Sequence, residues 1–199
     1  MNALMKHLVI GVIIVMPFLG GAQITYEIKS HEIIIEGTSN LQSWTAEVKE
    51  ASGNFEISFE DGKIEGIHNV SVRFDATSIK GSEGRRMDAK IYESLKTDTY
   101  PKIDFVLRDI LSLAENPGTA RVSANGVLTI AGVSRLVELK TVGKVLPGGE
   151  LEFTGTHSIA MTDYNVKPPT AMFGALRTGD EITFSYRVVL RAQSPMVGL

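Results

Sequence analysis

The feature that most constrains the fold of this chain is a period-two alternation of apolar and polar residues. It is clearest over residues 181–191, where Ile182, Phe184, Tyr186, Val188 and Leu190 share one face. Because successive side chains of a strand point to opposite sides, this pattern predicts a half-buried strand. The alternation recurs over residues 33–35, 44–48, 55–59, 70–76, 103–107, 122–130, 137–145 and 151–161. The chain is therefore predicted to be mainly β.

Short turn signals separate these runs and predict how the strands are connected. Glycine, in two cases with proline, stands in the segments 61–62, 116–118, 131–132 and 147–149. Such residues allow the backbone to reverse within a few positions. We therefore expect neighbouring strands to be antiparallel.

One stretch, about residues 84–95, favours a helix. Met87, Ile91 and Leu95 recur there at a spacing of four between charged residues. Seven or eight strands with one apolar face cannot stay as an open sheet without exposing that face. The prediction is an all-β fold with one short helical insertion, closed as a lipocalin-like antiparallel barrel of about eight strands or folded as a sandwich.

Composition excludes several classes of site. The 199 residues suffice for one substantial core, and the net charge of −3 gives no broad attraction to nucleic acid. The absence of cysteine excludes disulfides, thiolate zinc sites, cysteine nucleophiles and a lipidated cysteine. No histidine pair has zinc-site spacing, and no phosphate-binding glycine loop or Gly-x-Ser-x-Gly motif occurs. We expect no cofactor, metal or catalytic residue.

The amino-terminal residues are typical of an export signal. Lys6 and His7 precede an apolar run over residues 8–19, which small residues follow up to Ala22. A membrane anchor is the alternative, but the run is shorter than the roughly 18–20 residues that a spanning helix needs. We expect a signal peptide over residues 1–22, a barrel domain over 23–193 and a tail over 194–199. The mature protein would then be periplasmic or secreted, without a membrane span.

Several motifs, in order, cover nearly the whole chain after this signal. They are 37–45 (GTSNLQSWT), 92–95 (YESL) with 100–105 (YPKIDF), 126–133 (GVLTIAGV), and 161–170 (MTDYNVKPPT) with 173–174 (FG), and together they resemble the YceI-like family. The resemblance implies an exported, lipocalin-like barrel with an internal tunnel for an isoprenoid or other long lipid tail, and no established catalytic reaction. At Gln42, Met161 and Asn165 the chain departs from residues common in that family, which are histidine, arginine and glycine.

The predicted inner face mixes small residues with large aromatic ones. This mixture either leaves a long apolar cavity or lets small residues on one strand accommodate large ones on another, and the pattern leaves both open. The candidate ligand-binding residues are Trp44, Phe74, Phe105, Leu128, Phe153, His157, Met161, Met172, Phe173, Leu176, Phe184 and Tyr186. The last loop, 163–178, carries Met172, Phe173 and Leu176, which we interpret as a lid or as a plug of the core.

Three functions remain after these exclusions. The first is an exported protein that binds an isoprenoid or other long-chain lipid for sequestration or transport. The second is a filled-barrel structural or stress-related protein, and the third a hydrolase in which His157, Asp163 and Tyr164 form an acid–base cluster. His157 is either a contact for a ligand head group or a core histidine. Arg85 and Arg86 form either a solvated face or a guard for a phosphate head group. Whether two barrels associate as a homodimer is left open.

Overall fold

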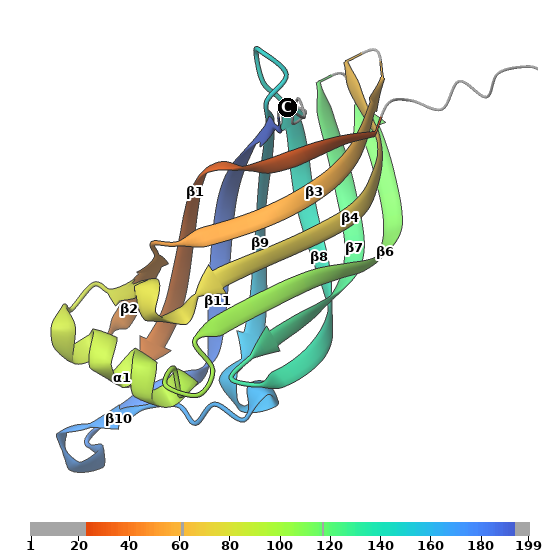
Figure 1. Ribbon diagram of the computed structural model, residues 1–199. Coiled ribbons are helices and arrows are strands. Elements are labelled where there is room, and N and C mark those ends of the chain that lie inside the picture. The colour runs from red at the N-terminus through yellow and green to blue at the C-terminus, as the bar shows by residue number, and fades with distance from the viewer. Residues whose placement is uncertain (1–22, 61, 117, 194–199) are drawn as a thin grey trace, which may run out of the picture.

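The computed structural model describes residues 23–60, 62–116 and 118–193, and strands make up most of it (Figure 1). The expected signal peptide, 1–22, and tail, 194–199, lie outside the described residues. The strands are β1 Gln23–Ser39, β2 Ser43–Val48, β3 Ala51–Glu60, β4 Lys63–Asp75, β5 Ile79–Gly81, β6 Lys102–Asn116, β7 Thr119–Ile130, β8 Val133–Val145, β9 Leu151–Ala160, β10 Thr170–Ala171 and β11 Leu176–Ala192. The helices are α1 Arg85–Leu95 and the short 3₁₀ turns η1 Ala76–Ser78, η2 Met161–Tyr164 and η3 Met172–Gly174.

Eight of these strands close into an antiparallel barrel. Their order around the ring is β11-β9-β8-β7-β6-β4-β3-β1, and β1 pairs with β11 to close it. β2 and β5 extend from β1 outside the ring, and β10 pairs only with β11. The prediction of an all-β barrel with one short helix is confirmed, and the sandwich alternative is excluded.

The alternation in the sequence determines which side chains the barrel encloses. Along β7, Val122, Ala124, Leu128 and Ile130 are all buried, as is Gly126. The residues that alternate with them are Ser123, Asn125, Val127 and Thr129, and these are partly exposed. The closing ladder sets Ile33 and Ile35 of β1 opposite Tyr186 and Phe184 of β11. Residues about 150 positions apart in the sequence therefore share one inner surface.

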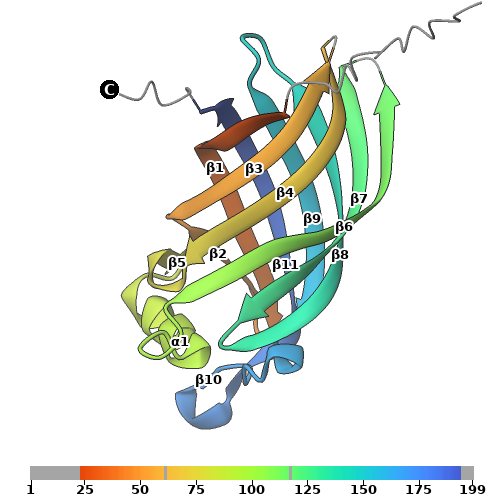
Figure 2. The same ribbon diagram turned by 45° about the vertical axis from the view of Figure 1, so that its right-hand side comes forward.

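The two ends of the barrel differ. Figure 1 shows the end of the barrel where β1 starts and β11 finishes. A cluster of buried side chains packs at this end. That cluster contains Tyr26, Phe55, Ile57, Ile64, Ala120, Leu151, Phe153 and Leu190. At the opposite end, α1, β2 and the segment around β10 lie close to the barrel opening, as both ribbon views show (Figure 2).

Helix α1 is anchored at both ends by local interactions. Gly84, with a φ of 78°, precedes it, and the Asp88 carboxylate accepts a hydrogen bond from the Gly81 N–H at 2.8 Å. Lys96, in the left-handed region, ends it. The predicted apolar stripe of Met87, Ile91 and Leu95 packs against the buried residues Ile33, Ala46, Val48 and Ile79. The helix therefore covers part of the barrel interior.

The segment 163–178, expected as a loop, contains more pairing than predicted. β10 pairs with the start of β11 through Thr170 with Arg177, so the last strand begins at Leu176. Phe173 and Gly174 both have positive φ angles, 55° and 87°, which reverse the chain between the two strands. The result is a short hairpin beside the helical end of the barrel (Figure 2).

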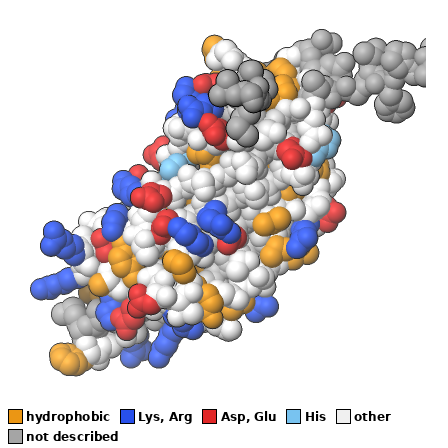
Figure 3. Space-filling view, in the orientation of Figure 1, with side chains coloured by type: hydrophobic (Ala, Val, Ile, Leu, Met, Phe, Trp, Pro, Cys, Tyr) orange, Lys and Arg blue, Asp and Glu red, His pale blue; other side chains and the backbone are white. Residues whose placement is uncertain are grey.

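The face of the molecule in Figure 3 carries charged side chains of both signs, with scattered hydrophobic side chains among them. Cross-strand ion pairs join Arg187 to Glu152 and Arg191 to Glu27 at 2.6 and 2.7 Å. No helix in the described residues has the length and apolar character needed to cross a membrane.

Candidate ligand-binding cavity

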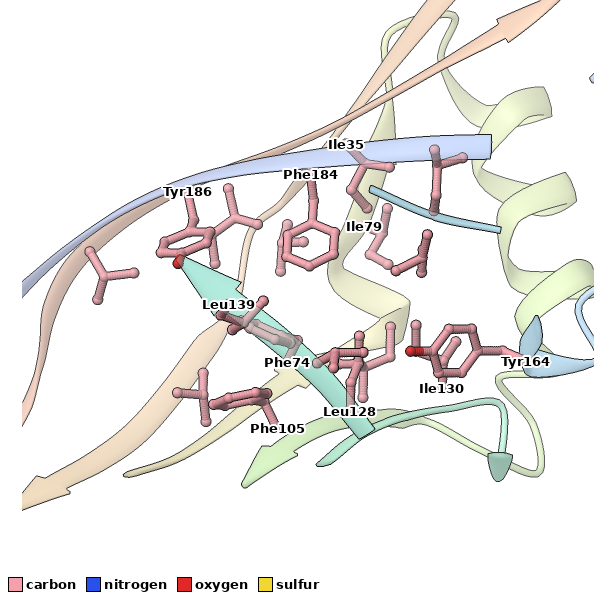
Figure 4. Close-up of a pocket in the computed structure, with 18 of the residues that line it drawn as sticks. Ile35, Phe74, Ile79, Phe105, Leu128, Ile130, Leu139, Tyr164, Phe184 and Tyr186 are labelled. Atoms are coloured by element: carbon pink, nitrogen blue, oxygen red, sulfur yellow. The ribbon is translucent and has the colours of Figure 1, made fainter. Parts of the chain in front are cut away.

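The barrel is not filled, and an apolar cavity of about 280 Å³ remains inside it. The walls come from every strand of the ring and from α1, and Figure 4 shows part of the lining. The cavity lies between the packed cluster at one end and the helix-covered end. Its volume approaches the roughly 300–1,000 Å³ of small-molecule sites.

Glycines on one strand make room for aromatic rings from the next. A Cβ atom at Gly126 would lie 2.2 Å from the Phe105 ring, and one at Gly155 would lie 2.4 Å from the Tyr186 hydroxyl. Gly143, opposite Phe153 in the β8–β9 ladder, is packed in the same way. The small residues thus accommodate large ones locally, as one interpretation of the sequence proposed, but the aromatic rings still leave a cavity between them.

The helical end of the cavity is covered by α1 and by the continuous segment that runs from η2 to β10. Ile91, Ser94 and Leu95 come from α1, and Tyr164 comes from η2. Val166 and Pro169 follow in the chain leading to β10. This cover is formed by a helix and a loop segment, not by strands of the ring.

Most of the sequence-predicted binding residues line this cavity. They are Trp44, Phe74, Phe105, Leu128, Phe153, Met161, Phe184 and Tyr186. Trp44 also donates its indole N–H to the Thr38 carbonyl at 3.1 Å, which fixes its ring at the cavity wall.

The other four predicted binding residues are not among the lining residues. The half-buried His157 ring lies edge-on to Phe184, with 5.5 Å between ring centroids. Leu176 is partly exposed at the start of β11, and the Phe173 side chain is fully exposed. The side chain of Met172 lies outside what the structure describes.

Sequence reasoning missed several lining residues. Val137, Leu139, Ile159 and Ile182 follow the same alternation and could have been added from it. Tyr164, Val166 and Pro169 lie in a segment without periodicity, so no local signal indicated that they face the cavity.

Burial changes the protonation behaviour of the polar groups in and beside the cavity. It raises the pKa of Tyr186 and of Tyr164, so both phenols remain protonated donors at neutral pH. It lowers the pKa of His157, which favours the neutral imidazole. In the described chain no group of three or more acidic or histidine side chains is arranged to hold a metal ion.

Comparison with known proteins gives a family and several structural relatives. A family model for the YceI-like domain matches residues 26–190. No curated protein sequence matches this chain.

The solved structures that resemble this chain share its fold. A polyisoprenoid-binding domain from Saccharophagus degradans, implicated in plant cell wall breakdown, superposes with a TM-score of 0.67 at 14% identity, covering 85% of this chain and 99% of its own. BcnA from Burkholderia cenocepacia gives a TM-score of 0.61 at 19% identity, and the match covers 80% of this chain and 95% of BcnA. The YceI protein of Campylobacter jejuni gives a TM-score of 0.56 at 18% identity, and the match covers 75% of this chain and 84% of that protein.

Proposed function

The chain belongs to the YceI-like family, and from that premise we propose that it binds an isoprenoid-type or other long-chain amphiphile inside the barrel, for sequestration or transport. The observation that carries the proposal is the apolar cavity of about 280 Å³ within a closed barrel. The similar fold of the polyisoprenoid-binding domain from Saccharophagus degradans supports the same ligand class.

The apolar wall is sufficient to give useful affinity. Each buried methylene contributes roughly 0.8 kcal/mol, so about fifteen of them contribute roughly 12 kcal/mol before the cost of association. After several kcal/mol are subtracted for association, a micromolar dissociation constant remains. Binding therefore does not depend on chemistry at the cavity wall.

The polar groups suggested for a hydrolase have separate contacts. His157 packs on Phe184, the Asp163 carbonyl accepts from the Arg135 Nε at 2.8 Å, and the Tyr164 ring enters the cavity. We propose a binding role for this cavity rather than a catalytic one.

Export is also part of the proposal. The apolar segment of residues 8–19 and the small residues before Gln23 support cleavage after Ala22. Intact-mass analysis of the exported protein should give a chain that starts at Gln23. A protein that keeps residues 1–22 and stays in the membrane fraction would contradict it.

A cavity-filling variant tests the binding proposal. Ala124 lines the cavity on β7, so Ala124→Phe should occupy space that the ligand needs. The matched control is Asn125→Phe, which puts the same side chain on the opposite face of the same strand. Organic extraction followed by mass spectrometry should find a stoichiometric amphiphile in the parent and the control, and much less in Ala124→Phe.

A second measurement covers the case in which no ligand is loaded in the producing cell. Farnesol can be titrated into the protein and followed by the fluorescence of Trp44, the single tryptophan of the sequence and a lining residue. Saturable binding by the parent and the control, weakened in Ala124→Phe, is expected. Failure of the parent to bind either a cellular amphiphile or farnesol would overturn the proposed function.

A further inference from the structure

The cavity wall contains few polar groups, and in the described chain none of its lining residues carries a charged side chain. The hydroxyls at the wall belong to Ser94, Thr141, Tyr164 and Tyr186. A charged head group inside this cavity would lose its hydration without gaining a counter-charge, which is strongly unfavourable. The wall is therefore suited to an uncharged ligand.

Two of these hydroxyls already have partners. The Thr141 hydroxyl donates to the Thr154 carbonyl at 2.8 Å, at the point where the β8–β9 ladder ends. Burial raises the pKa of the Tyr186 phenol, and the interaction of this phenol with the Thr141 side chain acts in the opposite direction and lowers it. These groups satisfy one another and stabilise the wall without a ligand.

Tyr164 is different, because its hydroxyl is buried and has no hydrogen-bond partner within the described part of the chain. The residue is only 1% exposed. Figure 4 shows its side chain extending from the end beside α1, with the hydroxyl directed into the cavity near Ile130. Buried hydroxyls in folded proteins are nearly always hydrogen-bonded, so an unpaired one at a cavity wall calls for an explanation.

The backbone on both sides of Tyr164 is fixed. The Asn165 N–H donates to the Thr162 carbonyl and the Val166 N–H to the Met161 carbonyl, each at 3.1 Å. The Arg135 Nε donates to the Asp163 carbonyl. This turn therefore holds Tyr164 at the cavity wall.

From this geometry we propose that the Tyr164 hydroxyl donates a hydrogen bond to an uncharged oxygen of the bound amphiphile, such as an alcohol or carbonyl oxygen. This inference rests on the proposed function and narrows its ligand class. The cavity then prefers a neutral, oxygen-bearing isoprenoid to the bare hydrocarbon and to the diphosphate. The oxygen lies at the helix-covered end, and the apolar tail extends toward the packed cluster.

Three probes with the same type of isoprenoid tail test this preference: farnesol, farnesene and farnesyl diphosphate. Each is titrated into delipidated protein and followed by Trp44 fluorescence. The parent should bind farnesol more tightly than the other two. Tyr164→Phe should weaken farnesol binding roughly tenfold, the effect of one ordinary hydrogen bond, and leave farnesene binding unchanged.

The matched control is Tyr26→Phe, which removes a phenol hydroxyl from a residue of the packed cluster instead of from the cavity wall. It should leave the preference for farnesol intact. The melting temperature of ligand-free Tyr164→Phe should equal or exceed that of the parent, because the substitution removes an unpaired buried group.

The outcomes separate this inference from the proposed function. If the parent binds none of the three probes, both fail. If the parent binds farnesol and farnesene equally, or Tyr164→Phe weakens both by the same factor, the binding function stands and the role of Tyr164 is overturned. Tighter binding of the diphosphate than of farnesol overturns the preference for an uncharged ligand.

Discussion

Leu128 faces the cavity from β7 and is 5% exposed, whereas Leu136, on the neighbouring strand β8, is 65% exposed on the outer surface. Leu128→Asp puts an unpaired carboxylate into the apolar interior, so the free energy of unfolding should fall by roughly 2–4 kcal/mol. Leu136→Asp is the matched control and should change it by less than about 0.5 kcal/mol. Urea unfolding of both variants measures the difference, and equal effects would contradict the assigned inner and outer faces.

His157 gives the protein a predicted dependence of stability on pH. Burial lowers its pKa in the folded state below the ordinary 6.5, so the unfolded chain takes up the proton first as the pH falls. The neutral His157 ring therefore makes its full contribution to stability above about pH 6.5, and this contribution is lost progressively as the pH falls below that value.

The pH effect can be isolated with one substitution. The free energy of unfolding should decrease from pH 7.5 to pH 5, and the decrease should be smaller in His157→Asn, which cannot be protonated in this range. Urea unfolding of parent and variant at the two pH values measures this difference. An identical pH dependence in parent and variant would show that His157 does not titrate differently on folding.

Among the elements, α1 was predicted from its apolar spacing, and the structure gives that spacing a second role. Leu95 packs against two clusters of buried residues and also lines the cavity. The helix is thus part of the cover of the cavity as well as of the core. Its position could not be read from the sequence, because the residues it packs on come from several distant elements, among them β1, β2, β5 and β7.

Release of ligand should depend on this cover. Leu95→Ala removes apolar contact at the helical end of the cavity, so we expect farnesol to dissociate several-fold faster. Phe173→Ala is the comparison, because the exposed Phe173 ring lies away from the lining residues. Stopped-flow Trp44 fluorescence gives both rates. If Phe173→Ala accelerates release as much as Leu95→Ala, the hairpin after residue 169 is the lid that the sequence suggested.

On the scale of the whole molecule, the two ends of the barrel should differ in local stability. Ile57, Ile64, Leu151 and Leu190 are almost completely buried at the packed end. The other end surrounds the cavity and is covered by α1, in which no residue is fully buried. Local opening is easiest where few apolar contacts must be broken.

Hydrogen exchange followed by mass spectrometry can measure this difference. Amides of β3 and β9 near the packed cluster should exchange slowest, and those of α1 fastest among the regular elements. Added farnesol should slow exchange in α1 more than at the packed end, because a ligand stabilises the states that bind it. Slow exchange in α1 without ligand would contradict this picture.

The sequence by itself determined the strands, the helix and the two faces of the sheet, because side-chain direction alternates with a fixed period along a strand. That was enough to identify Phe74, Leu128 and Tyr186 as inward-facing. Only the tertiary structure decided that space remains between them. Alternation says which side of the sheet a residue faces, but not which residue of a distant strand it meets, as Phe105 meets Gly126. For the same reason the sequence could not show that His157 packs edge-on against Phe184 or that Tyr164 lines the cavity.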